Sequence, residues 1–331
     1  MATLTTTHPT LLDLARRTDP DGKIADIVEI LNQTNEILQD MVWIEGNLTT
    51  GHRSTIRTGL PAPTWRKLYG GVQPTKSTTA QITDNCGMLE AYAEVDKALA
   101  DLNGNSAEWR LSEETPHIEG MSKEIAETIF YGNEGTEPEA FTGLSPRFND
   151  ESAANADNII SGGGSGSDNA SIWLCVWGPN TGHGIVPKGS QAGLQMKDLG
   201  EVTIENVDGN GGRMQAYRSH YRWDAGLTIR DWRYFVRIAN IDRSALTSDA
   251  STGANLPNLM FEALDRLPNM NGRSAFYMDR GILTKLRQQT AAAVKQSALT
   301  VEQVGGIPVT SFQQVPIRRV DVLSGDEATV A

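Results

Sequence analysis

The segment Ser161–Gly178, SGGGSGSDNASIWLCVWG, holds the residues best suited to chemistry, because a glycine-rich loop can wrap its backbone N–H groups around a phosphate. A Walker loop needs a lysine after its last glycine, but Ser167 follows Gly166 and the next lysine is Lys188. A dinucleotide loop needs a strand before the glycines and a helix after them. Here a turn-rich segment precedes the glycines and a predicted strand, Ile172–Trp177, follows them. We therefore expect a flexible connection into a buried strand and no phosphate site.

Metal-binding and nucleophile patterns do not appear elsewhere in the sequence. The five histidines (His8, His52, His117, His183 and His220) form no HExxH pattern, and the two cysteines, Cys86 and Cys175, form no CxxC pair that would bind zinc. We therefore predict no catalytic, cofactor-binding or metal-ligating residues, no cofactor, and a protein that is not an enzyme. Because catalytic triads assemble from distant segments, an enzyme with a scattered site at His183 or at the glycine-rich loop remains an alternative.

Arginine and aromatic residues alternate in residues 213–243, a composition typical of grooves that bind single-stranded nucleic acid. The alternation has period 2, which places Tyr217 and Tyr221 on one face of a strand and Arg218 and Arg222 on the other. All the basic residues are arginines, which suit bidentate pairing with carboxylates. We favour ion pairing, within the chain or between subunits, over a solvated face or nucleic-acid binding. The arginines are Arg213, Arg218, Arg222, Arg230, Arg233, Arg237 and Arg243.

Charge is unevenly distributed along the chain, whose formal net charge of −12 argues against a protein that coats nucleic acid. Residues 46–83 contain five basic residues and no acidic one, whereas residues 84–151 contain sixteen acidic and four basic residues. Either these clusters arise by chance on a solvated surface, or a basic arm lies over an acidic surface of its own chain or of a neighbour. Complementary patches of this kind fix which partners pair and in which register.

The first half of the sequence predicts two helices with a β-rich segment between them. Residues 24–40 place apolar side chains on one helical face. Residues 47–87 are rich in Thr, Gly and Pro without helical periodicity, which predicts a long hairpin-like excursion. Such a segment is either disordered or ordered by packing on something else. Thr115 as cap, Pro116 at the first position and Gly132 at the exit predict a helix over about residues 115–131.

The second half mixes strands and helices without a regular βαβ period, which predicts an α+β class. We expect strands at 172–177, 213–241, 274–278 and 315–320, and a loop at 182–189. Helices are expected over 255–267 and after a cap at Asp279. With 331 residues, the chain is expected to form one large domain or two ordinary ones. It contains no run of 18 apolar residues, so we expect no membrane span. It shows no signal-peptide pattern, so we expect its two thiols to be reduced.

An ordered set of segments resembles the major capsid proteins of tailed double-stranded DNA phages, which share the Hong Kong 97 fold. The stretch TPHIEGMSKEIAETIFYGN, followed by FTGLSPRFND, is similar to that family's spine helix and the segment after it. WRYFVRIANIDRSAL, NGRSAFYMDRGILTKLRQQ and VGGIPVTSFQQV are similar to later segments. The group of about 330-residue proteins from short-tailed phages of the epsilon15 and Bordetella-phage kind is the nearest in layout, and the likeness covers nearly the whole chain.

The resemblance implies five segments: an N-terminal arm and helix (1–46), an extended loop (47–90), a peripheral domain with the spine helix (91–160), an axial domain with peripheral strands (161–310), and a C-terminal strand and tail (311–331). It implies a structural protein of the virion that is assembled in the host cytoplasm. Copies would form the hexamers and pentamers of an icosahedral head enclosing double-stranded DNA, which is packaged without specific contacts. Cement, scaffold and portal proteins are possible partners, and no membrane is involved.

The resemblance and the charge pattern together predict an intersubunit contact, in which the basic loop docks on acidic residues of a neighbour. The predicted residues are Arg53, Arg57, Arg66, Lys67 and Lys76 on one side and Glu113, Glu114, Glu119, Glu124, Glu127, Glu134, Glu137 and Glu139 on the other. The alternatives are another self-assembling viral or encapsulin-like shell or tail protein, the scattered-site enzyme described above, and a nucleic-acid binder.

Overall fold

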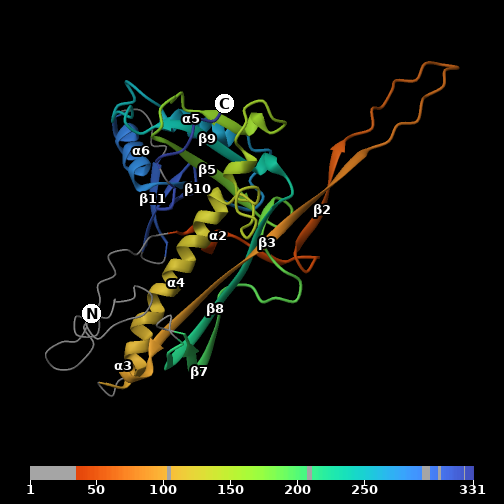
Figure 1. The fold of residues 1–331 in the computed structure, drawn as a ribbon. Coiled ribbons are helices and arrows are strands. Elements are labelled where there is room, and N and C mark those ends of the chain that lie inside the picture. Colours follow the sequence, from red (N-terminus) through yellow and green to blue (C-terminus); the bar gives the residue numbers. More distant parts are fainter. Residues whose placement is uncertain (1–34, 103–105, 207–210, 293–298, 305–306, 324) are drawn as a thin grey trace. The chain divides into compact units, whose positions relative to one another are not determined.

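The structure, a computed structural model, describes residues 35–102, 106–206, 211–292, 299–304, 307–323 and 325–331. They divide into two compact units (Figure 1). For the described residues, the first unit comprises Met88–Ile125 and Gln191–Asp224, and the second comprises Thr34–Gly87, Ala126–Ser190 and Ala225–Ala331. None of the helices in the described ranges is long and apolar enough to cross a membrane.

The second unit is built around β5 (Asn169–Trp177), a strand that is buried at every position. β5 pairs antiparallel with β9 (Phe235–Asp242) and with β10 (Arg273–Met278), and β10 pairs parallel with β13 (Val315–Arg319). A strand that is buried on both faces has no polar alternation, and the run IWLCVW has none. The strand predicted over Ile172–Trp177 is therefore confirmed.

Both faces of this sheet are covered by apolar side chains. On one face Leu174 belongs to a core with Met260 of α5 (Leu256–Asp265) and Leu286 of α6 (Arg280–Ala292). On the other face the ring of Trp173 lies 6.3 Å from that of Phe130. Both helices were predicted, one over residues 255–267 and one after a cap at Asp279, and the structure confirms them. Asp279 accepts from the Gly281 N–H, and Asn255 accepts from the Asn258 N–H.

Short elements complete the second unit. They are α2 (Ile37–Asp40), β1 (Trp43–Glu45), η1 (Ser145–Arg147), η2 (Ala156–Asn158), β4 (Ile159–Ser161), β6 (Gly182–Val186), η3 (Trp232–Tyr234), β11 (Leu299–Val304) and β12 (Ile307–Phe312). The predicted helix over 24–40 lies outside the described residues up to residue 34, and its described end is α2.

The predicted hairpin-like excursion over 47–87 is also confirmed. β2 (Gly51–Gly59) pairs antiparallel with β3 (Thr78–Asp96), from Gly51 opposite Asn85 to Gly59 opposite Thr78. Residues 60–77 form the connection and contain no helix or strand. In Figure 1 this connection (orange) extends away from the rest of the second unit.

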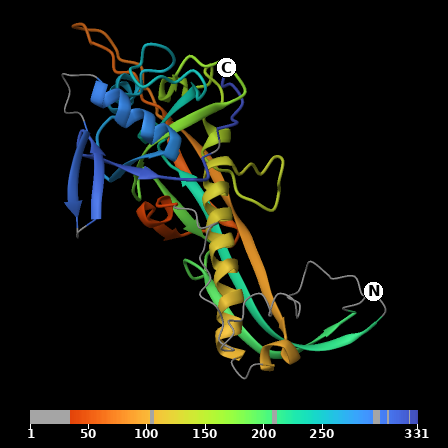
Figure 2. The same cartoon turned by 90° about the vertical axis from the view of Figure 1, so that its left-hand side faces the viewer.

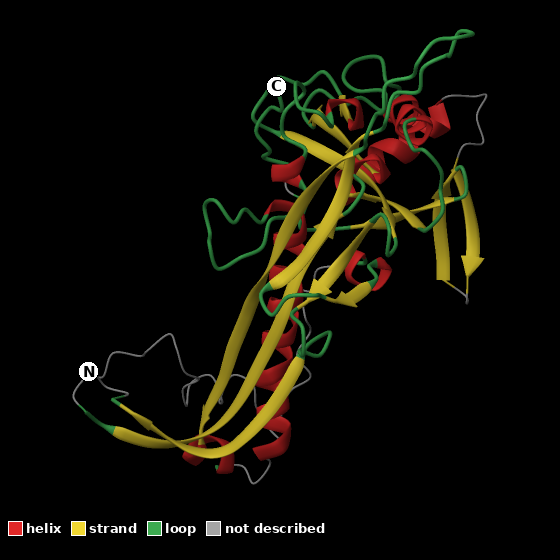
Figure 3. Ribbon diagram, turned by 90° about the vertical axis from the view of Figure 1, so that its right-hand side faces the viewer, coloured by secondary structure: helices red, strands yellow, loops and turns green. Residues whose placement is uncertain are grey.

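In the first unit, one long helix packs on a sheet. β7 (Gln195–Glu205) pairs with β8 (Arg213–Ile229), and β8 neighbours β3. Met121 of α4 (Ser106–Tyr131) packs with Ala93 of β3 and Tyr221 of β8, while Trp109 packs with Val95 and with Ala100 of α3 (Lys97–Asp101). Figures 2 and 3 show the helix running alongside these strands.

The start of this helix was predicted wrongly. α4 begins at Ser106, and Pro116 lies inside it. Thr115 does not cap, because its hydroxyl donates to the Leu111 carbonyl one turn back, 3.0 Å away. Proline removes one helical hydrogen bond, but Trp109, with 2% of its surface exposed, anchors the preceding turns against Val95 and Ala100. Tertiary packing therefore extends the helix past a local stop signal.

The loop predicted over Gly182–Gly189 is also wrong at its beginning. Gly182–Val186 form β6, which is buried throughout and pairs parallel with β1 and antiparallel with β8. A Cβ on Gly184 would lie 2.5 Å from the ring of Trp43, and one on Gly182 would overlap the ring of Phe235. These glycines make room for aromatic rings and do not form a turn.

Candidate intersubunit surface

The glycine-rich segment is a connection in the second unit that two backbone hydrogen bonds hold against β9, and it leads into a buried strand as expected. A three-residue strand, β4, precedes the glycines, and β5 follows them. The N–H groups of Gly162 and Gly164 each donate at 2.7 Å to carbonyls of β9, Ala239 and Asn240. A Cβ on either glycine would lie within 2.8 Å of the Asn240 carbonyl oxygen. The glycines therefore allow close backbone approach, and a strand stands where a phosphate loop needs a helix.

The histidine singled out in the sequence is a buried core residue. His183 lies in β6 with 1% of its surface exposed, and its ring centroid is 5.9 Å from that of His52. In the described ranges, no three His, Cys, Asp or Glu side chains gather as metal ligands do.

The arginine-rich segment pairs with carboxylates of the same chain, as the period-2 pattern indicated. The pairs are Arg213–Glu205, Arg218–Glu94, Arg222–Asp224, Arg233–Asp231, Arg237–Glu327 and Arg243–Asp279. Arg230 donates to the Pro179 carbonyl instead. Most of these carboxylates lie outside residues 84–151; from that acidic stretch, Glu94 pairs with Arg218 and Glu90 lies 3.8 Å from Arg222.

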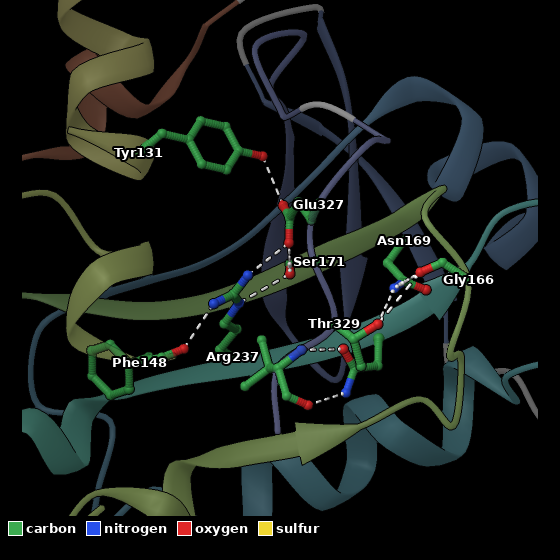
Figure 4. A network of polar contacts seen from close by, with 10 residues as sticks. Tyr131, Phe148, Gly166, Asn169, Ser171, Arg237, Glu327 and Thr329 are labelled. Atoms are coloured by element: carbon green, nitrogen blue, oxygen red, sulfur yellow. Dashed lines mark hydrogen bonds and ion pairs between the residues drawn. The ribbon is translucent and has the colours of Figure 1, made fainter. Parts of the chain in front are cut away.

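Arg237 is the most enclosed of these arginines and organises the network in Figure 4. Its guanidinium lies 2.7 Å from the Glu327 carboxylate, and both side chains are at least 95% buried. It also donates to the Phe148 carbonyl and to the Ser171 hydroxyl, while Tyr131 donates to Glu327 at 2.7 Å. Each charged group is thus hydrogen-bonded on several sides, which a buried ion pair requires. The network fastens the last residues of the chain to β5 and β9.

The predicted basic residues lie on the β2–β3 hairpin and on its connection, and all five are exposed. Arg53 donates to the Thr83 hydroxyl at 3.2 Å, and Arg66 donates to the Gly70 carbonyl at 2.9 Å. Within the described part of the second unit, none of the five forms an ion pair with Glu127, Glu134, Glu137 or Glu139. In the described part of this unit, the predicted acidic residues therefore do not neutralise the basic surface of the hairpin.

The predicted acidic residues differ in how far their own chain engages them. Glu114 accepts from the Ser219 hydroxyl at 2.6 Å and lies 3.7 Å from Arg110. Glu134 accepts from Asn85. Glu124, Glu127, Glu137 and Glu139 are exposed, whereas Glu113 and Glu119 are half-buried. Glu114 and Glu134 therefore make hydrogen bonds within their own subunit. The exposed acidic residues are better placed to pair with basic residues of a second subunit.

Large apolar residues sit among these basic side chains, and they were not predicted from the sequence. Trp65 and Tyr69 are 101% and 102% exposed, and Leu60 and Leu68 are 78% and 89% exposed. Tyr69 takes a positive φ of 63° in the turn that the Gly70 N–H closes on the Lys67 carbonyl. The sequence does contain a signal for them: large apolar residues in a turn-rich segment whose pattern predicts no strand or helix that would bury them. Several large apolar side chains that stay exposed within one short segment favour an interaction site.

Comparisons with known proteins agree on one family. A family model described as "Major capsid protein GP7" matches residues 19–331. A chain in a cryo-EM-derived structure of bacteriophage epsilon15 is 41% identical, covers 100% of both chains and superposes with a TM-score of 0.79. A chain from the capsid of bacteriophage JBD30, decorated with minor capsid protein trimers, is 12% identical over 97% of each chain with a TM-score of 0.45. No curated protein matches the chain.

Proposed function

The chain belongs to the family of the major capsid protein GP7, and we propose that it builds its shell by laying the β2–β3 hairpin and residues 60–77 on a second copy of itself. It has the Hong Kong 97-type capsid fold, with mixed α+β content, and it is a structural subunit of an icosahedral phage capsid. This capsid role replaces the enzyme and nucleic-acid alternatives as the function of the chain.

The observation that carries the proposal is the pair of exposed rings, Trp65 and Tyr69, in the connection between β2 and β3. Tryptophan, tyrosine and arginine are the residues that most often dominate the energy of protein interfaces. An aromatic side chain buries 150–250 Å², so leaving two of them in water is costly for a free subunit. A second copy of the chain provides the cover, because capsid subunits repeat the same contact around the shell.

Charge selects where on the second copy the hairpin docks. The five basic residues of the hairpin and its connection would face the acidic residues of 113–139, with Glu127, Glu137 and Glu139 the first candidates because they are exposed. Ion pairs at the rim of an interface contribute mainly to register and association rate, while the buried rings contribute most of the affinity. The two kinds of residue therefore divide specificity and strength between them.

The finer points of assembly follow from this contact. The repeated contact would produce hexamers and pentamers, assembled in the host cytoplasm and retained in the virion. Cement, scaffold and portal proteins would be the further partners. The net charge of −12 fits a shell wall that holds double-stranded DNA without binding it specifically.

The test is reversal of four charges, Arg53→Glu, Arg57→Glu, Arg66→Glu and Lys67→Glu, in one variant. We expect a folded subunit that forms no shells, because like charges would then meet across the contact. Sedimentation velocity with negative-stain imaging measures assembly, and circular dichroism checks the fold. Intact shells from this variant would contradict the proposal.

A matched control reverses four basic residues of the same unit that lie off the hairpin: Lys188→Glu, Arg273→Glu, Arg280→Glu and Lys285→Glu. The control changes the net charge by the same amount, so it separates a general charge effect from loss of the proposed contact. We expect it to assemble.

A further inference from the structure

Two histidines face each other where the β2–β3 hairpin leaves the core of the second unit. His52 is the second residue of β2, and His183 is the second residue of β6. Their ring centroids are 5.9 Å apart with an interplanar angle of 73°. In both rings Nδ1 is buried, and no described residue provides it with a hydrogen-bond partner. A buried nitrogen without a partner is uncommon and calls for a physical reason.

Other charged groups around the pair are already engaged or are positive. Asp84 of β3 is opposite His52 in the strand register, and its carboxylate is 2.8 Å from Arg147 and also accepts from Thr228. Arg230, which follows β8, lies close enough to disfavour a proton on either histidine. The nearest carboxylate is therefore neutralised, and a second guanidinium adds positive charge.

The other described titratable groups near β6 are engaged elsewhere. From β3, the Cys86 thiol donates to the Ile185 carbonyl at 3.9 Å. From β1, Glu45 is held by the Gly189 N–H at 2.8 Å. From the segment before β9, Asp231 pairs with Arg233 at 2.7 Å.

We propose that His52 and His183 form a pH-dependent latch at the root of the β2–β3 hairpin, the point where the hairpin leaves the core of the second unit. The latch is closed while both rings are neutral and opens when they take up protons. Neutral rings pack edge to face and let β2 lie against β6. Two imidazolium rings at this distance would repel each other and the two guanidiniums in a site with little water. Opening the root exposes the rings to water and relieves that repulsion. The latch rests on contacts within one subunit, and only its consequence for assembly rests on the proposed function.

The direction of the pH response follows from linkage. Burial, together with the neighbouring His52, lowers the pKa of His183 to about 4, and burial, together with Arg230, lowers the pKa of His52. In the open form both rings return toward the ordinary value of about 6.5. The open form therefore binds more protons between these values, so the closed form is stable above pH 6.5 and loses stability as the pH falls toward 4. For His183 alone, the opening constant should rise about 30-fold between pH 7.5 and pH 5.

Hydrogen exchange on the full-length protein tests the latch. Exchange of amides in Gly51–Gly59 and Gly182–Val186 is measured at pH 7.5 and pH 5 and corrected for the intrinsic pH dependence of exchange. We expect opening to increase at least about 30-fold in the wild type, because His52 adds to the effect of His183. In the double variant His52→Gln and His183→Gln the increase should fall below about 3-fold, because neither side chain can take up a proton.

His220→Gln is the matched control, since this histidine lies in β8 beside Glu90 and is partly exposed. It should keep the wild-type response. Should the double variant fold poorly, His52→Gln alone and an NMR titration of the His183 ring replace it. An equal opening constant at both pH values, a full response in the double variant, or a His183 ring that titrates near 6.5 would each overturn the latch. Intact shells from the charge-reversed variant would contradict the proposed function and leave these exchange rates unchanged, so the two proposals fail separately.

Discussion

Two regions of the second unit use the same residue types in opposite ways. Around β5, Trp173 and Trp177 are at most 1% exposed, and Arg237 is closed off by Glu327, Ser171 and the Phe148 carbonyl. On the β2–β3 connection, Trp65 is fully exposed, and among the described residues Arg66 has only a backbone carbonyl as partner. In the first region the aromatic and charged side chains are buried and paired by their own chain, whereas in the second region they stay exposed to solvent. The contrast indicates that stability and assembly reside in different segments, and substitutions can test that division.

Removal of the buried carboxylate should give the largest effect on stability. Glu327→Ala leaves Arg237 charged and at least 95% buried without its partner. Breaking a buried ion pair in this way costs about 3–5 kcal/mol, because the remaining charge is uncompensated. Thermal and urea unfolding of the variant should show this loss.

The control for Glu327 is Glu205→Ala, which breaks the Arg213–Glu205 pair, whose side chains are each 69% exposed. It should change the free energy of unfolding by less than about 0.5 kcal/mol. Equal losses for the two variants would mean that the network in Figure 4 does not carry the stability of the unit.

Trp65→Ala should show the reverse pattern. The free energy of unfolding of the single subunit should stay within about 0.5 kcal/mol of wild type, because the ring contacts nothing that folding buries. Assembly should weaken by about 2–4 kcal/mol per contact, as expected for an aromatic hot spot. The protein concentration at which shells form, followed by light scattering, measures this change.

Met270→Ala provides the comparison for Trp65, since Met270 is 46% exposed in the same unit but lies off the hairpin. It should leave both quantities unchanged. If Trp65→Ala instead lowered the unfolding free energy by several kcal/mol with assembly intact, the hairpin would belong to the stable core. Stability and assembly would then not reside in different segments.

Local signals in the sequence were sufficient for much of the fold. The apolar run of β5, the period-2 pattern of β8 and the cap at Asp279 all act over a few residues, and each was confirmed. The hairpin was also predictable, because turn residues flank stretches rich in Thr and Ile.

Contacts between distant residues were not predictable. Glu327 is 90 residues from Arg237, so nothing local marks it as the partner of that arginine. Trp109 stabilises the early turns of α4 through Val95 and Ala100, which overrides the stop signal at Pro116. The basic and acidic residues assigned to the intersubunit contact stay a prediction, since their partners belong to a second copy of the chain.

Gly184 gives the test with the smallest expected effect. It asks how closely the side chains around β5 and β6 are packed, because the substitution changes packing and no charge. A Cβ at this position would lie 2.5 Å from the ring of Trp43, so Gly184→Ala must displace that ring or the backbone of β6. Overpacking of this kind costs about 1–3 kcal/mol, which urea unfolding would detect. Gly120→Ala is its control: a Cβ there meets nothing within 4 Å, and replacing glycine inside a helix should stabilise by about 0.5–1 kcal/mol. Opposite signs for the two substitutions are expected, because the glycine of β6 is required by a neighbour and the glycine of α4 is not. If both substitutions stabilised the protein, β6 would have room to spare, and the second unit would not be the closely packed counterpart of its exposed hairpin.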